Sequence, residues 1–356
     1  MNLLRAGCFQ LVQSSLDCNI QTNIITITKM ITVSLQIIVI LATGNFYAYL
    51  LTAAAVELLQ KIYVSHYLNR LYPYLKDKRV EKLTKEETGE VVTKTKALVL
   101  HKVGDVARLQ TDSMIISSFI NVTVNGFVDN YNMIMNSAAN VVNIVFNSVL
   151  SSFGNLIATE SKDRQYELFK VYRFAASWIY GFAAVGFAIL LTPFITLWVG
   201  AERTLAFSVI GCILIDFYFK GERIVLSNFK TAAGVFEQDK YLALIQGVVN
   251  LVISIVLVVR IGLVGVYIGT IVSGLIANVT KPIIIYHVIL DRKAGEYFRD
   301  SVKYCLMLAG QFALFYGISK VVMPVVTMQS FLIMFVIISV LFNVIFAVLF
   351  WKTGEF

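Results

Sequence analysis

The sequence is short of charge. Only 15% of its 356 residues are charged, whereas a soluble domain has about 25%. Proline is also scarce, with 4 residues, while hydrophobic residues make up 58%. The mean hydropathy is +0.74, and several apolar runs are long enough to cross a bilayer. This composition excludes a soluble enzyme, a secreted disulfide-rich protein and a disordered chain, and it predicts an all-α polytopic membrane protein.

Cysteine and histidine, the residues of many metal and catalytic sites, are equally rare. They are Cys8, Cys18, Cys212, Cys305, His66, His101 and His287. The cysteines follow no metal-binding spacing, so we expect free thiols. The scattered histidines predict neither a zinc site nor a Ser-His-Asp triad, and the sequence has no P-loop or GxGxxG motif. We therefore expect no metal, no cofactor and no catalytic residue.

Apolar runs separated by polar or turn-forming breaks predict about ten membrane-spanning helices. They lie at approximately 24–43, 46–66, 98–120, 122–150, 171–196, 204–224, 241–260, 262–287, 302–322 and 330–351. Ionisable residues near the predicted ends of these runs, such as Asp216 and Lys220, could reach the membrane surface, and we assign them no role.

Lysine and arginine are unevenly distributed among the breaks. Most lie in four long breaks, at 70–96, 162–173, 220–240 and 292–303, and few lie in short ones such as Gly44-Asn45. By the positive-inside rule the long breaks face the cytoplasm, and an even number of helices places both termini there. The net charge of +8 is therefore a topology signal with some attraction to anionic lipid headgroups, and no sign of nucleic acid binding.

The third predicted helix carries a cluster of ionisable residues: His101, Lys102, Asp105, Arg108 and Asp112. At helical periodicity they share an arc of roughly 120°, and the opposite charges lie three or four residues apart. One interpretation is a buried salt-bridge cluster that fixes helix packing. The other is the rim or floor of a translocation cavity, where the planar guanidinium of Arg108 could bind a phosphate.

The fourth predicted helix carries a row of polar side chains. They are Asn125, Asp129, Asn132, Asn136, Asn140, Asn143 and Asn147. The spacing places them within an arc of roughly 80°, over a length of about 33 Å. Hydrogen bonds between helices could explain two or three of them. The whole row is better explained as the lining of a water-filled cleft, because each amide offers donors and an acceptor to sugar hydroxyls.

Six short segments of the sequence occur in the order and spacing typical of one family, although each segment alone is a weak indication. They are LYPYL at Leu71–Leu75, QTDSMIIS at Gln110–Ser117, SFGNL at Ser152–Leu156, PFITLWVG at Pro193–Gly200, AGVFEQDKY at Ala233–Tyr241 and GVYIGTI at Gly265–Ile271. Over residues 24 to 350, the sequence resembles the polysaccharide flippase branch of the multidrug/oligosaccharidyl-lipid/polysaccharide exporter superfamily.

This resemblance implies a MATE-like, flippase-type bundle of two six-helix lobes around a central cavity, usually followed by two more helices. It implies a transporter of the bacterial cytoplasmic membrane that moves a lipid-linked oligosaccharide, carried on undecaprenyl pyrophosphate, to the outer leaflet by alternating access. Such transport serves surface polysaccharide (capsule or O-antigen) biosynthesis. The implied partners are that substrate, membrane lipids and other polysaccharide-assembly proteins.

The resemblance also divides the chain. Residues 1–22 match the family poorly, 23–67 correspond to the last two helices of the first lobe and 68–97 to a cytoplasmic linker. Residues 98–290 correspond to the second six-helix lobe, and 291–356 to the two additional helices. About four helices of the first lobe have no counterpart. We therefore expect a truncated chain that is not an independent flippase.

Two other functions fit part of the pattern. A drug/cation antiporter of the same superfamily would need an acidic and aromatic cavity without basic groups, which Lys102 and Arg108 argue against. A membrane-embedded polysaccharide polymerase or ligase would need a large loop on the outer side of the membrane, and no predicted outer loop is longer than a few residues. We therefore expect a transporter and not an enzyme.

Overall fold

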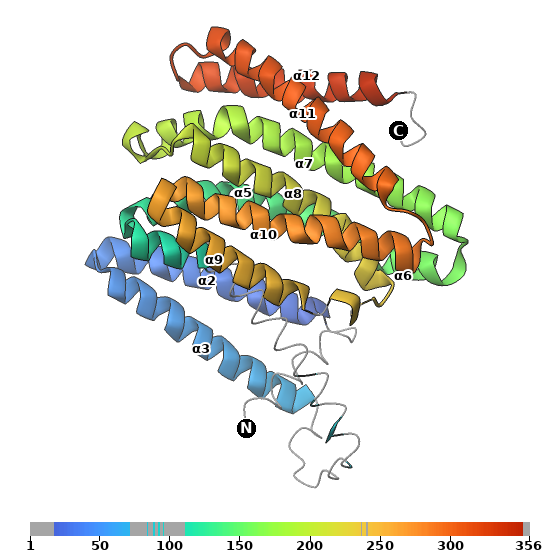
Figure 1. Cartoon of the computed structure of the whole chain (residues 1–356). Helices are drawn as coiled ribbons and strands as arrows, with labels where there is room; N and C mark the ends of the chain where they lie inside the picture. Colours follow the sequence, from blue (N-terminus) through green and yellow to red (C-terminus); the bar gives the residue numbers. More distant parts are fainter. Residues whose placement is uncertain are drawn as a thin grey trace. The chain divides into compact units, whose positions relative to one another are not determined.

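In a computed structural model, the described residues are 18–71, 111–235, 237–239 and 241–351, together with Thr84, Thr88, Gly89, Val92 and Thr95. The chain forms two compact units, Met1–Thr88 and Gly89–Phe356. Regular secondary structure in the described part is entirely helical. The prediction of an all-α fold is therefore confirmed. Figure 1 labels the helices of each unit.

The first unit contains a hairpin of two long helices, α2 (Cys18–Thr43) and α3 (Phe46–Leu71). The turn between them uses Gly44, whose φ of 59° favours glycine. Asn45 then caps α3, because its side-chain oxygen accepts hydrogen bonds from the backbone N–H groups of Tyr47 (2.8 Å) and Ala48 (3.4 Å). Both predicted spans in this region coincide with helices.

The second unit begins, in its described part, with a helical stretch over 111–119. It continues with α5 (Val122–Ser148), α6 (Leu150–Thr159), α7 (Lys162–Val199), α8 (Phe207–Ala232), α9 (Leu242–Ile261), α10 (Leu263–Ile284), α11 (Gly295–Val322) and α12 (Met328–Phe350). Short helical turns, η2 (Ala201–Arg203), η3 (Glu237–Asp239) and the π-helical η4 (Ile285–Ile289), lie between them. Most predicted spans here coincide with a helix to within a few residues.

The long basic breaks differ from the prediction. Residues 162–173 are the first turns of α7, capped by Ser161, and α8 continues to Ala232. Likewise, α11 begins at Gly295, so most of the break at 292–303 is helical. The apolar run marks the part of a helix that suits lipid, but backbone hydrogen bonding continues beyond it into charged sequence.

Seven helices of the described residues are long and apolar enough to cross a membrane. They include α2, α7, α9, α10, α11 and α12, together with the α5–α6 stretch. Two predicted spans, now α3 and α8, form helices of 26 residues but are less apolar. In α8 the reason is a group of ionisable side chains, Asp216, Lys220, Glu222 and Arg223. Neighbouring helices surround α8, so these charges have protein partners.

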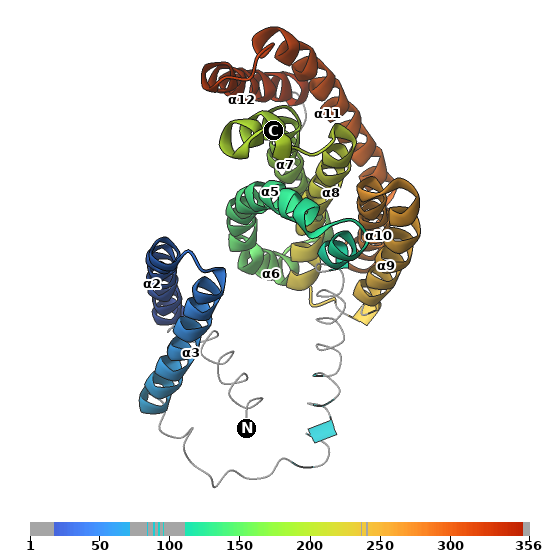
Figure 2. The ribbon, with the colours of Figure 1, turned by 90° about the vertical axis from the view of Figure 1, so that its left-hand side faces the viewer.

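The core of the second unit forms around α8, which packs against α5, α6, α7 and α10. Figure 2, viewed nearly along the helices, shows α11 and α12 on the outer side of α7, and α9 beside α10. The approach of α7 to α8 depends on Gly221, because a Cβ atom there would lie 2.1 Å from Cγ of Tyr180. The turn from α9 to α10 depends on Gly262, whose φ is 63°.

Arg173 of α7 joins α11 to the core. Its guanidinium donates hydrogen bonds to the backbone oxygen of Tyr297 (2.8 Å) and to Oγ of Ser301 (2.6 Å). It also lies 3.6 Å from the centre of the Tyr297 ring. The carboxylates of Glu222 on α8 and Asp300 on α11 lie 3.8 and 4.0 Å from it. A single buried cation therefore links three helices.

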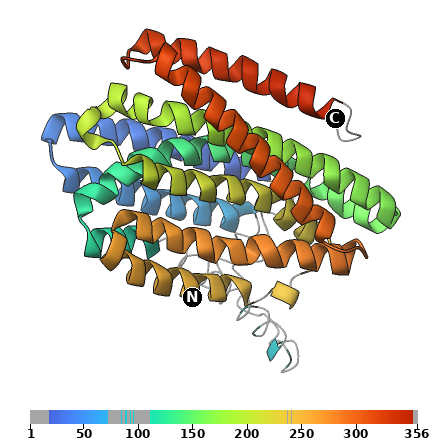
Figure 3. The same ribbon diagram turned by 45° about the horizontal axis from the view of Figure 1, so that its top comes forward.

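The two ends of the second unit differ in their number of basic residues. The connections after α7, α9 and α11 lie at one end of the bundle, and those after α6, α8 and α10 lie at the other, with the end of α12 (Figures 1 and 3). We call the latter the basic end. The basic residues near it are Lys162, Arg164, Lys170, Arg173, Lys230, Lys281, Arg292, Lys293, Arg299 and Lys303. The opposite end has Arg203, Arg260 and Lys320. That the basic end faces the cytoplasm stays a prediction.

Candidate functional site

Helix α5 presents three different faces. Val128, Tyr131, Met135 and Phe146 are buried, on the side that packs against α7 and α8. The predicted polar row lies beside this buried face, about 100° around the helix axis. A third face is exposed and mostly apolar, with Val141, Ile144 and Val145 as examples. Each face takes up roughly a third of the circumference.

The end of the polar row nearest α6 is bound to neighbouring helices. The hydroxyl of Tyr180 on α7 donates a hydrogen bond to Oδ1 of Asn143 (2.5 Å). The side-chain amide of Asn228 on α8 donates one to Oδ1 of Asn147 (3.1 Å) and another to the backbone oxygen of Phe146 (3.2 Å). Here the amides act in helix packing, the alternative that could explain two or three members of the row.

The remaining members of the row have different surroundings. Asn136 and Asn140 are exposed and form no side-chain hydrogen bond with the described part of the chain. Asp129 is exposed as well, and Asn132, which is partly buried, lies within reach of the Tyr267 hydroxyl on α10. Asn125 is partly buried, and its Oδ1 has no hydrogen-bond partner among the described residues. This part of the row has polar groups to offer a ligand.

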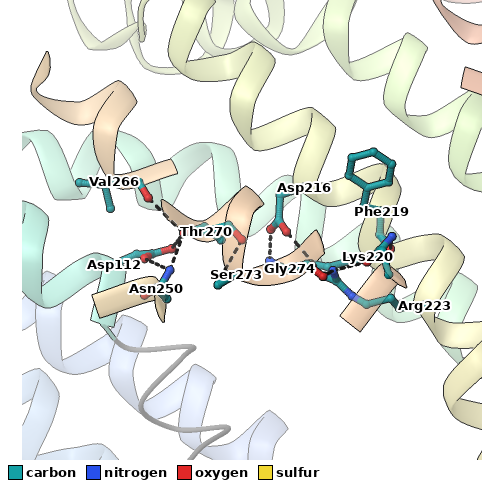
Figure 4. A network of polar contacts seen from close by, with 11 residues as sticks. Asp112, Asp216, Phe219, Lys220, Arg223, Asn250, Val266, Thr270, Ser273 and Gly274 are labelled. Atoms are coloured by element: carbon teal, nitrogen blue, oxygen red, sulfur yellow. Dashed lines mark hydrogen bonds and ion pairs between the residues drawn. The ribbon is translucent and has the colours of Figure 1, made fainter. Parts of the chain in front are cut away.

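Asp112 connects the polar row to a network inside the bundle (Figure 4). Its carboxylate accepts hydrogen bonds from the Thr270 hydroxyl (2.6 Å) and the Asn250 amide (3.4 Å), and Asn250 also donates to the Thr270 oxygen (3.0 Å). Tyr267 lies near both Asp112 and Asp129. The carboxylate therefore joins helices α9 and α10 to the helical stretch that precedes α5.

The other members of the predicted charged cluster, His101, Lys102, Asp105 and Arg108, lie outside the described residues. Their proposed pairing with Asp112 stays a prediction. The contacts that the structure does show for Asp112 are hydrogen bonds to uncharged side chains of other helices. The sequence analysis did not identify these partners, Asn250 and Thr270.

A second part of the network lies on α8 (Figure 4). Asp216 pairs with Lys220 (2.6 Å) and Arg223 (3.6 Å). Arg223 also donates hydrogen bonds to the Gly274 backbone oxygen (3.0 Å) and to Oδ1 of Asn278 (2.6 Å). Asp216 and Arg223 are buried, and the Lys220 side chain is half exposed. Asp216 therefore does not lie near a helix end, because α8 extends to Ala232 and places Asp216 well inside the helix.

The network residues on α9 and α10 were missed from the sequence, although a signal existed. On α9, Gln246, Asn250 and Ser254 follow one another at intervals of four residues and are all buried. On α10, Thr270, Ser273 and Asn278 are buried among small residues. Buried polar residues at helical spacing in an apolar helix indicate an interior face. Only the row on α5 was long enough to be recognised.

The site offers amides, hydroxyls, carboxylates and the half-exposed ammonium group of Lys220. Such groups suit hydrogen bonding to hydroxyls and ion pairing with phosphate. Lys220 also interacts electrostatically with Asp112, so the two parts of the network are neighbours. Within the described ranges, no group of three or more His, Cys, Asp or Glu residues could hold a metal ion.

Comparison with protein-family models gives no match, and neither does comparison with curated proteins. Among solved structures, the chain matches the lipid II flippase MurJ in an inward closed conformation, with a TM-score of 0.55 and 15% sequence identity. The fold is similar to that of MurJ. The match covers 90% of this chain and 65% of MurJ, so the chain spans less than two thirds of MurJ's length.

The similarity to MurJ confirms the prediction of a flippase-type helical membrane bundle. At 15% identity it shows the fold and not the substrate. The polysaccharide branch of the superfamily and the absence of N-terminal helices stay predictions. The assignment of residues 98–290 to a second lobe likewise stays a prediction.

Proposed function

We propose that the chain belongs to a transporter that moves a lipid-linked oligosaccharide across the bacterial cytoplasmic membrane for capsule or O-antigen-like polysaccharide biosynthesis. MurJ, to which the fold is similar, is named for flipping a lipid, lipid II. The observation that carries the proposal is the polar row on α5. Asp129, Asn136 and Asn140 are exposed on a helix of an otherwise apolar bundle.

An exposed row of this kind is unfavourable against lipid. A carboxylate at the centre of a bilayer costs about 2.5–3.5 kcal/mol even on insertion scales. The neighbouring face with Val141, Ile144 and Val145 has no such cost, because it carries no charged side chain. The two faces therefore suit different surroundings. The polar row suits water and a hydroxyl-rich ligand, whereas the face with Val141, Ile144 and Val145 suits lipid.

The adjoining network supplies the charge that a pyrophosphate requires. Lys220 is half exposed, forms an ion pair with Asp216 (2.6 Å) and interacts electrostatically with Asp112. A cation paired with a carboxylate at the surface can exchange it for a phosphate oxygen. We therefore propose undecaprenyl-pyrophosphate-linked sugar as the substrate, with membrane lipids and other polysaccharide-assembly proteins as partners. The chain moves the substrate without covalent chemistry and is not an enzyme.

A translocation assay tests the proposal. A complete transporter that contains this chain is reconstituted into liposomes with an undecaprenyl-pyrophosphate-linked oligosaccharide that carries a fluorophore on its sugar. A membrane-impermeant quencher then destroys the fluorescence of the outer leaflet. With the wild-type transporter we expect the fluorescence of the inner leaflet to disappear over minutes, as the labelled lipid moves outward, and with Asn136→Leu/Asn140→Leu much more slowly.

The matched control is Val141→Leu/Val145→Leu, which changes the apolar face of the same helix and should leave translocation unchanged. If both double variants slowed translocation equally, the result would contradict a role for the polar row. Proton-driven uptake of a cationic dye without movement of the sugar lipid would contradict the proposed substrate and favour the antiporter function.

A further inference from the structure

A cavity of about 180 Å³ lies at the basic end of the second unit, away from the polar row. Its walls come from α7, α11 and the end of α12. They are Tyr166, Lys170, Glu296, Arg299, Asp300, Lys303, Tyr304 and Phe350. Neither the proposed transport path nor the polar network of Figure 4 includes any of these residues.

The cavity lies where α7 and α11 change from charged to apolar sequence, next to the apolar end of α12. On α7, charged residues end at Arg173, and an apolar stretch follows to the end of the helix. On α11, they end at Lys303 and resume only at Lys320. Helix α12 has no charged residue and ends with Phe350, followed by the exposed Trp351. Aromatic residues next to basic ones are typical of the membrane–water interface.

The cavity is lined by three cationic side chains and two carboxylates, and both carboxylates already have partners. Glu296 accepts a hydrogen bond from the Tyr166 hydroxyl. Asp300 is shared between Arg299 (3.7 Å) and Lys303 (3.5 Å), and Arg173 lies behind it at 4.0 Å. One carboxylate thus faces several cations.

These ion pairs can open for an anion. The Arg299 and Lys303 side chains are 66% and 63% exposed, and ion pairs of exposed side chains are weak. A phosphate diester presents two charged oxygens, for which an arginine and a lysine are suitable donors. The volume accommodates a phosphate with a small polar group, and the aromatic side chains Tyr304 and Phe350 provide an apolar rim.

We infer that this cavity binds the phosphodiester headgroup of an anionic membrane phospholipid such as phosphatidylglycerol. Arg299, Lys303 and Lys170 surround the phosphate, and the carboxylate of Glu296 accepts hydrogen bonds from headgroup hydroxyls. The acyl chains leave the cavity past Phe350 along the apolar surface of α12. Because the walls come from three helices, the bound lipid holds the α11–α12 pair against α7.

Native mass spectrometry of the purified full chain tests the site. The chain is titrated with phosphatidylglycerol in detergent, and the retained lipid is counted for wild type and for Arg299→Gln/Lys303→Gln. We expect one tightly bound lipid in the wild type and an affinity roughly 30-fold lower in the variant, since each basic residue near an anionic surface contributes about a factor of five. Arg299→Lys/Lys303→Arg should retain most of the binding.

The matched control is Arg203→Gln/Lys320→Gln, which removes the same charge at the opposite end of the bundle. Its affinity for phosphatidylglycerol should equal that of the wild type. Equal loss in both variants, or none in Arg299→Gln/Lys303→Gln, would overturn the assignment. So would equal retention of phosphatidylcholine. If inorganic phosphate at millimolar concentration displaced the lipid, the cavity would be a site for free phosphate.

Discussion

Replacing Arg173 with methionine should strongly destabilise the second unit. Among the described residues, the guanidinium is the only cationic group within 4 Å of the Glu222 carboxylate, whose side chain is 2% exposed. The substitution keeps a similar side-chain volume but leaves this carboxylate buried and unpaired, and it removes the hydrogen bonds to Tyr297 and Ser301. Breaking a buried ion pair in this way costs about 3–5 kcal/mol.

Thermal unfolding of the purified chain in detergent, followed by intrinsic fluorescence, measures this effect. At about 2–4 °C per kcal/mol for a unit of this size, the unfolding temperature should fall by roughly 10 °C. The double variant Arg173→Met/Glu222→Leu should recover most of this loss, because replacing both charges with apolar groups is often neutral. The coupling free energy from the single and double variants then measures the interaction between Arg173 and Glu222.

The control for Arg173 is Arg164→Met, which breaks an exposed pair with Glu167 (3.0 Å) on the same helix. Exposed pairs contribute about 0–1 kcal/mol, so the unfolding temperature should change little. If Arg173→Met were as stable as Arg164→Met, the buried cation would not be what joins α11 to α7 and α8.

Three further predictions concern packing, orientation and the charged cluster. Gly221→Ala should destabilise the chain by about 1–3 kcal/mol in thermal unfolding, because its Cβ would overlap the Tyr180 ring. In a cysteine-free background, a cysteine at Lys293 should react with an impermeant thiol reagent from the cytoplasmic side only, and one at Gly200 from the outside only. In the complete transporter, Arg108→Ala should abolish translocation of the sugar lipid, and Arg108→Lys should retain part of it.

Each of these three predictions has a result that would contradict it. Gly211→Ala meets nothing within 4 Å and should be neutral, so an equal loss at both glycines would exclude a specific clash. Labelling of Lys293 from outside would reverse the orientation. If Arg108→Ala translocated the sugar lipid normally but unfolded at a lower temperature, the charged cluster around Arg108 would have a structural role.

Hydropathy predicted the positions of the helices well but not their lengths. The apolar run of α7 begins near Phe174, whereas the helix begins at Lys162. Hydropathy reports which residues suit lipid, and twelve further residues are helical because Ser161 caps them and their backbone hydrogen bonds continue. The same effect extends α8 to Ala232 and moved Asp216 from a predicted helix end to the interior of the bundle.

The candidate site could be predicted only where one helix carried the whole pattern. The row on α5 is visible because its members repeat along one segment. Asn250 and Thr270 belong to shorter sets of buried polar residues on α9 and α10, and their contact with Asp112 joins positions more than 130 residues apart in sequence. The pattern of one helix indicates an interior face but does not show which distant residue lies against it.

Cysteine accessibility on α5 tests most directly whether the polar row lines a path for the sugar lipid. Single cysteines replace Asn136, Asn140, Val141 and Val145 in a chain without native cysteines, and a small charged thiol reagent is applied in liposomes. Cysteines at Asn136 and Asn140 should react quickly and be protected by undecaprenyl-pyrophosphate-linked oligosaccharide, whereas those at Val141 and Val145 should remain unreactive in lipid. Equal reaction on both faces, or no protection by the sugar lipid, would contradict a translocation path along α5.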